Sequence, residues 1–158
     1  MTATLVHATA VSIDGSGILL LGPSAAGKSD LALRLIDRGA LLISDDAVSV
    51  KPGVDGPELY AVPNIEGRME VRGIGIVKVA HVTHAPLRLA VELVQPIDRL
   101  PAHAENIDVA GFSVPSAKIA PFEASAPLKV EYALRMVIDA GTQPMASTPQ
   151  LTQESRND

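Results

Sequence analysis

The chain has 158 residues, 47% of them hydrophobic, and carries a net charge of −5 at pH 7. This length and apolar content suffice for one folded domain with a buried core, and they exclude a disordered chain. The acidic balance, with only two Phe, two Tyr and no Trp, argues against nucleic acid as a partner. The absence of Cys excludes disulfides and thiolate metal sites. Since no apolar run can span a membrane and the N-terminus lacks a signal-peptide pattern, we expect a soluble cytoplasmic protein without membrane contacts.

The first third of the chain alternates between strand and helix signals. Residues 5–22 predict two strands joined by a hairpin turn at Asp14-Gly15. The second of these strands, 18–21, leads directly into the sequence GPSAAGKS. Apolar residues at helical spacing then predict a helix over 31–36 that stops at Gly39. The sequence ALLIS predicts a short buried strand that ends in an Asp-Asp pair.

The remaining two thirds are richer in β signals. We expect a second hairpin over 47–62, turned by Pro52-Gly53 and Asp55-Gly56. The segment 69–82 is β-like, and its glycines predict a close backbone approach. Another strand at 87–94, Pro-containing loops from 95 to about 126 and an amphipathic helix over 128–141 follow. We therefore expect one domain over 1–141 and a loose polar tail over 142–158.

The octapeptide after the second strand has the form G-x-x-x-x-G-K-S, the outline of a phosphate-binding loop. In such a loop, backbone N–H groups and a helix N-terminus cradle a polyphosphate, the lysine reaches the β- and γ-phosphates, and the serine hydroxyl binds Mg²⁺. The alternative is a chance match in a glycine-rich turn, but the strand before it and the helix after it favour phosphate binding. The candidate phosphate-binding residues are Gly22, Pro23, Ser24, Ala25, Ala26, Gly27, Lys28 and Ser29.

Asp45 and Asp46 follow the predicted buried strand ALLIS. Carboxylates at the carboxyl end of such a strand lie where ligands bind in open α/β sheets. One can order a magnesium shell, and the other can accept a proton from an attacking hydroxyl. The alternative is a solvated turn, since Asp is common there. The phosphate-loop pattern just upstream favours the catalytic interpretation.

Several other polar residues have weaker signals. By its pattern alone Glu70 is a solvent-facing strand residue paired with Arg72 on the same face. His7 on an alternating strand is more commonly exposed or structural than catalytic. His81 and His84 form H-x-x-H without a third ligand at a suitable spacing, which argues against a metal site.

Taken together, these motifs resemble the catalytic domain of the HPr kinase/phosphorylase family. The matching elements, in the family's order and spacing, are His7, GPSAAGKS, LLISDD and MEVRGIGI, and the resemblance covers roughly residues 5–140. The stretch EVRGIGI is the most specific of them. The chain resembles the short proteobacterial form, which is the C-terminal catalytic domain without the separate N-terminal domain.

The resemblance implies an α/β fold of the HPr kinase/PEP carboxykinase-like type, a mixed β-sheet core containing the phosphate loop with a few flanking helices. It implies phosphoryl transfer from ATP, or in some members pyrophosphate, with Mg²⁺, to a serine of the phosphocarrier HPr, and the reverse phosphorolysis. It also implies a homo-oligomer, a hexamer in relatives. The residue roles that it implies are Lys28 on phosphate, Ser29 and Glu70 on magnesium, Asp46 as general base with Asp45 beside it, and His7 and Arg99 as further active-site residues.

Two departures from the family pattern affect these expectations. Ala25 stands where a glycine is usual in the loop. The sequence PFEASAP, 121–127, replaces a basic loop of the form P-V-[RK]-P-G-R-N that the family links to dephosphorylation and HPr contact. Because two cationic positions are lost, we predict that kinase activity survives and phosphorolysis is weak or absent.

Two other functions stay open. One is a kinase of the same fold that acts on a small hydroxyl compound such as free serine, because the altered loop changes the expected docking surface. The other is a nucleotide-responsive binding module with little turnover. Against this module, every loop and acidic residue to which we assign a role in transfer is present: Lys28, Ser29, Asp45, Asp46 and Glu70.

Overall fold

The computed structural model describes residues 2–95 and 105–147. Within these ranges lie two helices, α1 (Lys28–Asp37) and α2 (Ala126–Asp139). None of the helices in these ranges is long and apolar enough to cross a lipid bilayer. The strands are β1 (Thr4–Val6), β2 (Thr9–Ile13), β3 (Ser16–Leu21), β4 (Leu41–Ser44), β5 (Val48–Gly53), β6 (Gly56–Ala61), β7 (Arg68–Val71), β8 (Gly75–Lys78), β9 (His84–Leu93), β10 (Glu105–Val109), β11 (Phe112–Ile119) and β12 (Met145–Ala146).

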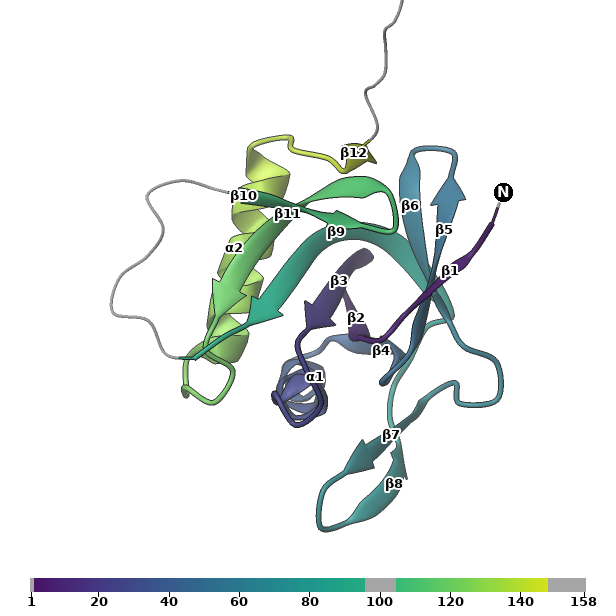
Figure 1. The fold of residues 1–158 in the computed structure, drawn as a ribbon. Coiled ribbons are helices and arrows are strands. Elements are labelled where there is room, and N and C mark those ends of the chain that lie inside the picture. Colours follow the sequence, from purple (N-terminus) through teal and green to yellow (C-terminus); the bar gives the residue numbers. More distant parts are fainter. Residues whose placement is uncertain (1, 96–104, 148–158) are drawn as a thin grey trace, which may run out of the picture.

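Ten of these strands form one curled, mixed sheet (Figure 1). Its main order is β1-β5-β6-β9-β3-β2-β4, and β11 joins it beside β9. Strand β3 runs parallel to β9, and β9 runs parallel to β11, whereas the other pairs are antiparallel. The carboxyl ends of β3, β9 and β11 therefore meet at one edge of the sheet, which is where α1 begins.

The core lies on both faces of the sheet. Ile18 and Leu20 of β3 pack into a cluster with both helices, while Leu19 points to a second cluster on the opposite face. Strands β5 and β6 cover that opposite face with Val48, Val50 and Leu59. Burial on both faces explains why β3 reads as an unbroken apolar run rather than an alternating one.

The predicted mixed sheet with few helices is confirmed, and so is the turn at Asp14-Gly15. Both turn residues have positive φ, 50° and 85°, as a two-residue hairpin turn requires. The strand expected ahead of this turn is broken in two, because the chain bends at His7-Ala8. The first piece, β1, pairs with β5, whereas β2 pairs with β3 and β4.

The segment that begins at Arg68 forms a separate two-stranded hairpin, β7–β8. The close backbone approach predicted from its glycines is wrong, since a Cβ placed on Gly73 or Gly75 would meet nothing within 4 Å. Both glycines instead have positive φ, +84° and +123°, and so allow the chain to reverse.

The prediction of loops from 95 to about 126 is wrong for residues 105–119, because β10 and β11 form a hairpin, whereas residues 120–125 form turns as predicted. Pro115 lies inside β11. On the edge of β11 that faces β12 and β9, it falls between the residues that pair with these two strands. β12 pairs with Phe112 and Ser113, and β9 pairs only from Ser116 onward. A proline that lacks an N–H donor is tolerated at such a gap.

Near the C-terminus, the chain described by the structure continues beyond the expected domain boundary at 141. Strand β12 pairs with β11, and Ser147 N donates to Gly111 O at 2.7 Å. The rest of the expected tail, 148–158, lies outside the described residues.

Candidate active site

The loop Gly22–Ser29 joins β3 to α1, as the sequence predicts. Gly27 ends the loop as the helix N-cap with φ 103°, and its carbonyl accepts the first helical hydrogen bond from Leu31 N at 2.9 Å. Ala25 also has positive φ, 66°, which costs energy for a residue with a Cβ atom. Ala25 therefore keeps a left-handed backbone conformation that favours glycine.

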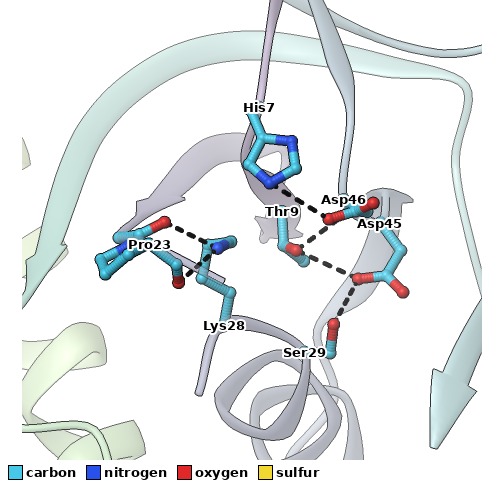
Figure 2. A network of polar contacts seen from close by, with 8 residues as sticks. His7, Thr9, Pro23, Lys28, Ser29, Asp45 and Asp46 are labelled. Atoms are coloured by element: carbon cyan, nitrogen blue, oxygen red, sulfur yellow. Dashed lines mark hydrogen bonds and ion pairs between the residues drawn. The ribbon is translucent and has the colours of Figure 1, made fainter. Parts of the chain in front are cut away.

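Lys28 lies under the loop and is 6% exposed. Its Nζ donates to the carbonyl oxygens of Gly22, at 2.7 Å, and Pro23, at 3.0 Å (Figure 2). The ammonium is therefore held against the loop by the loop's own backbone. This places one buried positive charge at the start of α1, beside the helix N-terminus.

Asp45 follows β4 and is 8% exposed. One carboxylate oxygen, Oδ1, accepts from Ser29 Oγ at 2.7 Å and from Thr9 Oγ1 at 3.0 Å, as Figure 2 shows. The other, Oδ2, accepts from Glu70 N at 3.3 Å. Three segments that are distant in the sequence thus converge on one carboxylate.

Asp46 differs from its neighbour because its side chain is 74% exposed. Its backbone has φ 68°, and its N–H donates to Thr9 Oγ1 at 3.2 Å. His7 Nε2 lies 3.5 Å from Asp46 Oδ1 (Figure 2). Of the two aspartates, Asp45 is therefore buried and hydrogen-bonded within the protein, whereas the Asp46 carboxylate is accessible to a ligand.

These groups line one cleft of about 430 Å³. The loop contributes Lys28 and Ser29, the end of β4 contributes Asp45 and Asp46, and the β7–β8 hairpin contributes Glu70. Arg72 lines the same cleft, but no ion pair joins it to Glu70 in the described ranges. With Asp30, which also lines it, the cleft thus combines the GPSAAGKS loop with four carboxylates.

The hard oxygen donors of this cleft fit magnesium rather than a softer metal. No group of three His, Cys, Asp or Glu side chains able to hold an ion by itself is found in the part of the chain that the structure describes. This arrangement fits an ion that takes one or two carboxylates and completes its shell with phosphate oxygens and water, as magnesium commonly does.

The remaining sequence candidates are not all part of this arrangement. Arg99 lies outside the described residues. His81 Nδ1 lies 3.2 Å from Val79 O, whereas His84 stacks on Tyr60, so these two histidines have different surroundings.

The sequence alone does not indicate every residue of the site. Thr9 is fully buried and bridges both aspartates, but a threonine on a strand has no sequence signal of this role. Phe122 also lines the cleft, whereas the sequence PFEASAP was notable only because it lacks the two basic residues expected there.

Comparison with known proteins places the chain in a family. The model of the HPr Serine kinase C-terminal domain matches residues 1–142. The HPr kinase/phosphorylase of Burkholderia lata is 37% identical over 129 residues, which are 74% of this chain and 40% of that protein. The corresponding protein of Cupriavidus metallidurans is 36% identical over 126 residues, or 72% of this chain and 39% of that protein.

A solved structure agrees with these relatives. The HPr(Ser) kinase/phosphatase from Coxiella burnetii matches with a TM-score of 0.76 and 28% identity, over 87% of this chain and 92% of that one. The chain spans about 40% of the length of the curated relatives it matches. From the family match, the shared fold and these relatives, we conclude that the chain belongs to the HPr serine kinase C-terminal domain family.

Proposed function

We propose that this chain transfers a phosphoryl group from magnesium-bound ATP to a serine of HPr. The observation that carries the proposal is the convergence of Lys28 and Ser29 with Asp45, Asp46 and Glu70 in one cleft. The names of the relatives, HPr kinase/phosphorylase, supply the acceptor. Phosphoryl transfer depends mainly on positioning and on stabilisation of phosphate charge, and these residues can provide both.

The donor's phosphates bind at the Gly22–Ser29 loop, where backbone N–H groups, the helix N-terminus and Lys28 offset their charge. Ser29 Oγ and the Glu70 carboxylate would hold magnesium, which would neutralise charge on the donor's phosphates. Asp45 orients this pair, because it accepts hydrogen bonds from Ser29 Oγ and from Glu70 N.

Asp46 acts as the general base. Its exposed carboxylate accepts the proton of the acceptor serine hydroxyl as the seryl oxygen forms a bond to the γ-phosphorus and the bond to the ADP oxygen breaks. His7, whose Nε2 lies 3.5 Å from Asp46 Oδ1, orients that carboxylate. Arg99 remains a proposed stabiliser of phosphate charge by family resemblance.

We further propose that phosphorolysis is weak. The segment that replaces the family's basic loop brings Phe122 to the cleft, and the Glu123 carboxylate pairs with Lys129 at 2.8 Å. The loop thus presents an aromatic ring where two cations are expected to capture phosphate. Robust release of pyrophosphate from phosphoseryl-HPr in the presence of inorganic phosphate contradicts this part of the proposal.

The altered loop also keeps a second candidate, a kinase for a small hydroxyl compound such as free serine. The test is a transfer assay with labelled ATP, Mg²⁺ and HPr from the same organism, with phosphoserine identified by mass spectrometry. Asp46→Asn should lower the rate by about 100-fold or more, as expected for a lost general base. Asp37→Asn, at the C-terminal end of α1, is the matched control and should leave the rate unchanged.

Transfer to HPr that disappears in Asp46→Asn supports the kinase and the base together. Transfer to free serine but not to HPr favours the small-molecule kinase. Tight nucleotide binding without transfer to either acceptor favours the binding module. The hexamer implied by the family is tested separately by light scattering, which should report six times the 16.5 kDa chain mass.

A further inference from the structure

Phe122 is an exposed aromatic residue placed directly against the phosphate-loop backbone. Phe122 is 70% exposed to solvent, yet its ring lies close against Gly27. A Cβ atom added to Gly27 would lie only 2.8 Å from Phe122 Cζ. The residue lines the catalytic cleft and also a second, adjoining hollow of about 620 Å³. A single exposed apolar side chain is common on protein surfaces, but this ring lines two adjoining hollows beside the phosphate loop, so a ligand in either hollow contacts it.

The turn that carries Phe122 is held in place by α1. Arg34 donates from Nη1 to Glu123 O at 3.3 Å and from Nη2 to Pro121 O, and it pairs with Asp30 at 3.0 Å. Because Arg34 lies on the helix whose first residues, Lys28 and Ser29, end the phosphate loop, the ring is positioned relative to that loop.

The order of the strands places Phe122 across the phosphate loop from the catalytic aspartates. The loop follows β3. Asp45 and Asp46 follow β4, which is reached from β3 through β2. Phe122 follows β11, which is reached from β3 through β9 on the other side. A donor whose reacting phosphate lies beside Asp46 therefore extends its other end toward Phe122.

The hollow beside Phe122 suits a flat, uncharged group. Its walls include the apolar residues Pro23, Ala26, Leu93 and Pro121. A heteroaromatic base stacks well on such a ring, and a purine offers the larger face. Pyrophosphate has no group that would occupy this surface.

We propose that Phe122 and this hollow bind the base of a purine nucleoside triphosphate, so that the donor is a nucleotide rather than pyrophosphate. The proposal rests on the proposed function, because it assumes that the Gly22–Ser29 loop binds the donor's phosphates. The PFEASAP segment would then bind the nucleotide donor, instead of binding inorganic phosphate as the basic loop is expected to do.

The test compares ATP with inorganic tripolyphosphate, which carries the same phosphates without a base, by calorimetry in the presence of Mg²⁺. Phe122→Ala should weaken ATP binding by about 10-fold or more and change tripolyphosphate binding by less than about two-fold. Phe122→Tyr should retain ATP affinity. The matched control is Tyr132→Ala, which removes a 60% exposed aromatic on α2 and should change neither affinity.

A second variant gives an optical readout. The chain contains no Trp, so Phe122→Trp introduces a single indole at the proposed site. ATP should change its emission and tripolyphosphate should not.

The inference is overturned if Phe122→Ala weakens both ligands equally or neither, or if it changes only the oligomeric state. If the unaltered protein binds tripolyphosphate and ATP equally well, the base subsite is wrong while the phosphate loop stands. If it binds neither, the proposed function fails as well.

Discussion

Thr9 uses one buried hydroxyl to hold both aspartates of the site. It donates to Asp45 Oδ1 at 3.0 Å and accepts from Asp46 N at 3.2 Å. The second bond supports Asp46 in a positive-φ backbone conformation that non-glycine residues rarely adopt. Thr9 is therefore a positioning residue for the proposed general base, acting through the backbone of Asp46.

Thr9→Val tests this role, because it keeps the shape and removes the hydroxyl. We expect a loss of about 1–3 kcal/mol in the free energy of unfolding, since a buried carboxylate and an amide both lose a partner. We also expect kcat for HPr phosphorylation to fall while KM for ATP changes little. Denaturant titration and steady-state kinetics measure the two effects. Thr9→Ser keeps the hydroxyl and should restore kcat, and its failure to do so contradicts the positioning role.

Ala25 offers a second test at the same scale. Because it has φ 66° in the phosphate loop, Ala25→Gly should relieve steric strain. We expect the free energy of unfolding to rise by roughly 0.5–1 kcal/mol in a denaturant titration. Ala26, the next residue, is the control, because its φ is not positive and Ala26→Gly should stabilise nothing. Equal effects of the two substitutions exclude strain as the cause.

At the scale of elements, α1 connects the phosphate loop to the turn before α2. Its first residues are Lys28 and Ser29. Further along the same helix, Arg34 donates hydrogen bonds to two backbone carbonyls of the turn before α2. Arg34 is partly buried, with 29% of its side chain exposed, so these hydrogen bonds are partly shielded from solvent.

Arg34→Met should release this turn while retaining the apolar stem. We expect a loss of about 1–3 kcal/mol in unfolding free energy, faster hydrogen exchange at the amide of Ala126, and weaker ATP binding through displacement of Phe122. Arg38→Met is the matched control, since Arg38 also joins α1 to α2 but through an exposed ion pair with Glu131. Equal exchange rates in the two variants contradict the proposed coupling.

At the scale of the whole molecule, the phosphate loop lies at the carboxyl end of a strand that is buried on both faces. Ligand binding at this loop should therefore raise the free energy of unfolding of the whole chain, because the binding residues come together only in the folded state.

Magnesium-bound ATP at 100 times its Kd should add about 2.7 kcal/mol to the unfolding free energy. For a domain of this size that corresponds to an increase of about 5–10 °C in Tm. Lys28→Met should remove most of this increase in Tm, because it removes the ammonium group that is bound to the loop carbonyls of Gly22 and Pro23. An undiminished shift in Lys28→Met places the nucleotide elsewhere.

The elements that the sequence predicted well are local. The strand–loop–helix order around GPSAAGKS and the turn at Asp14-Gly15 each depend on a few consecutive residues with strong backbone preferences. The β10–β11 hairpin was not predicted, because Pro115 is unusual inside a strand. Whether a strand accepts a proline depends on which neighbouring strands pair with it at that position.

By itself, the sequence determined the chemistry available to this protein: a phosphate-loop motif, an Asp pair after a buried strand, and a family-specific stretch around Glu70. Only the tertiary structure decided which residues act together. It tied Asp45 to Thr9 and to Glu70 N, 36 and 25 positions away, left Asp46 exposed beside His7, and set Phe122 against Gly27. The physical reason is that residue types and periodicity specify local backbone and buried faces, whereas the order of strands in the sheet determines which loops meet at its edge.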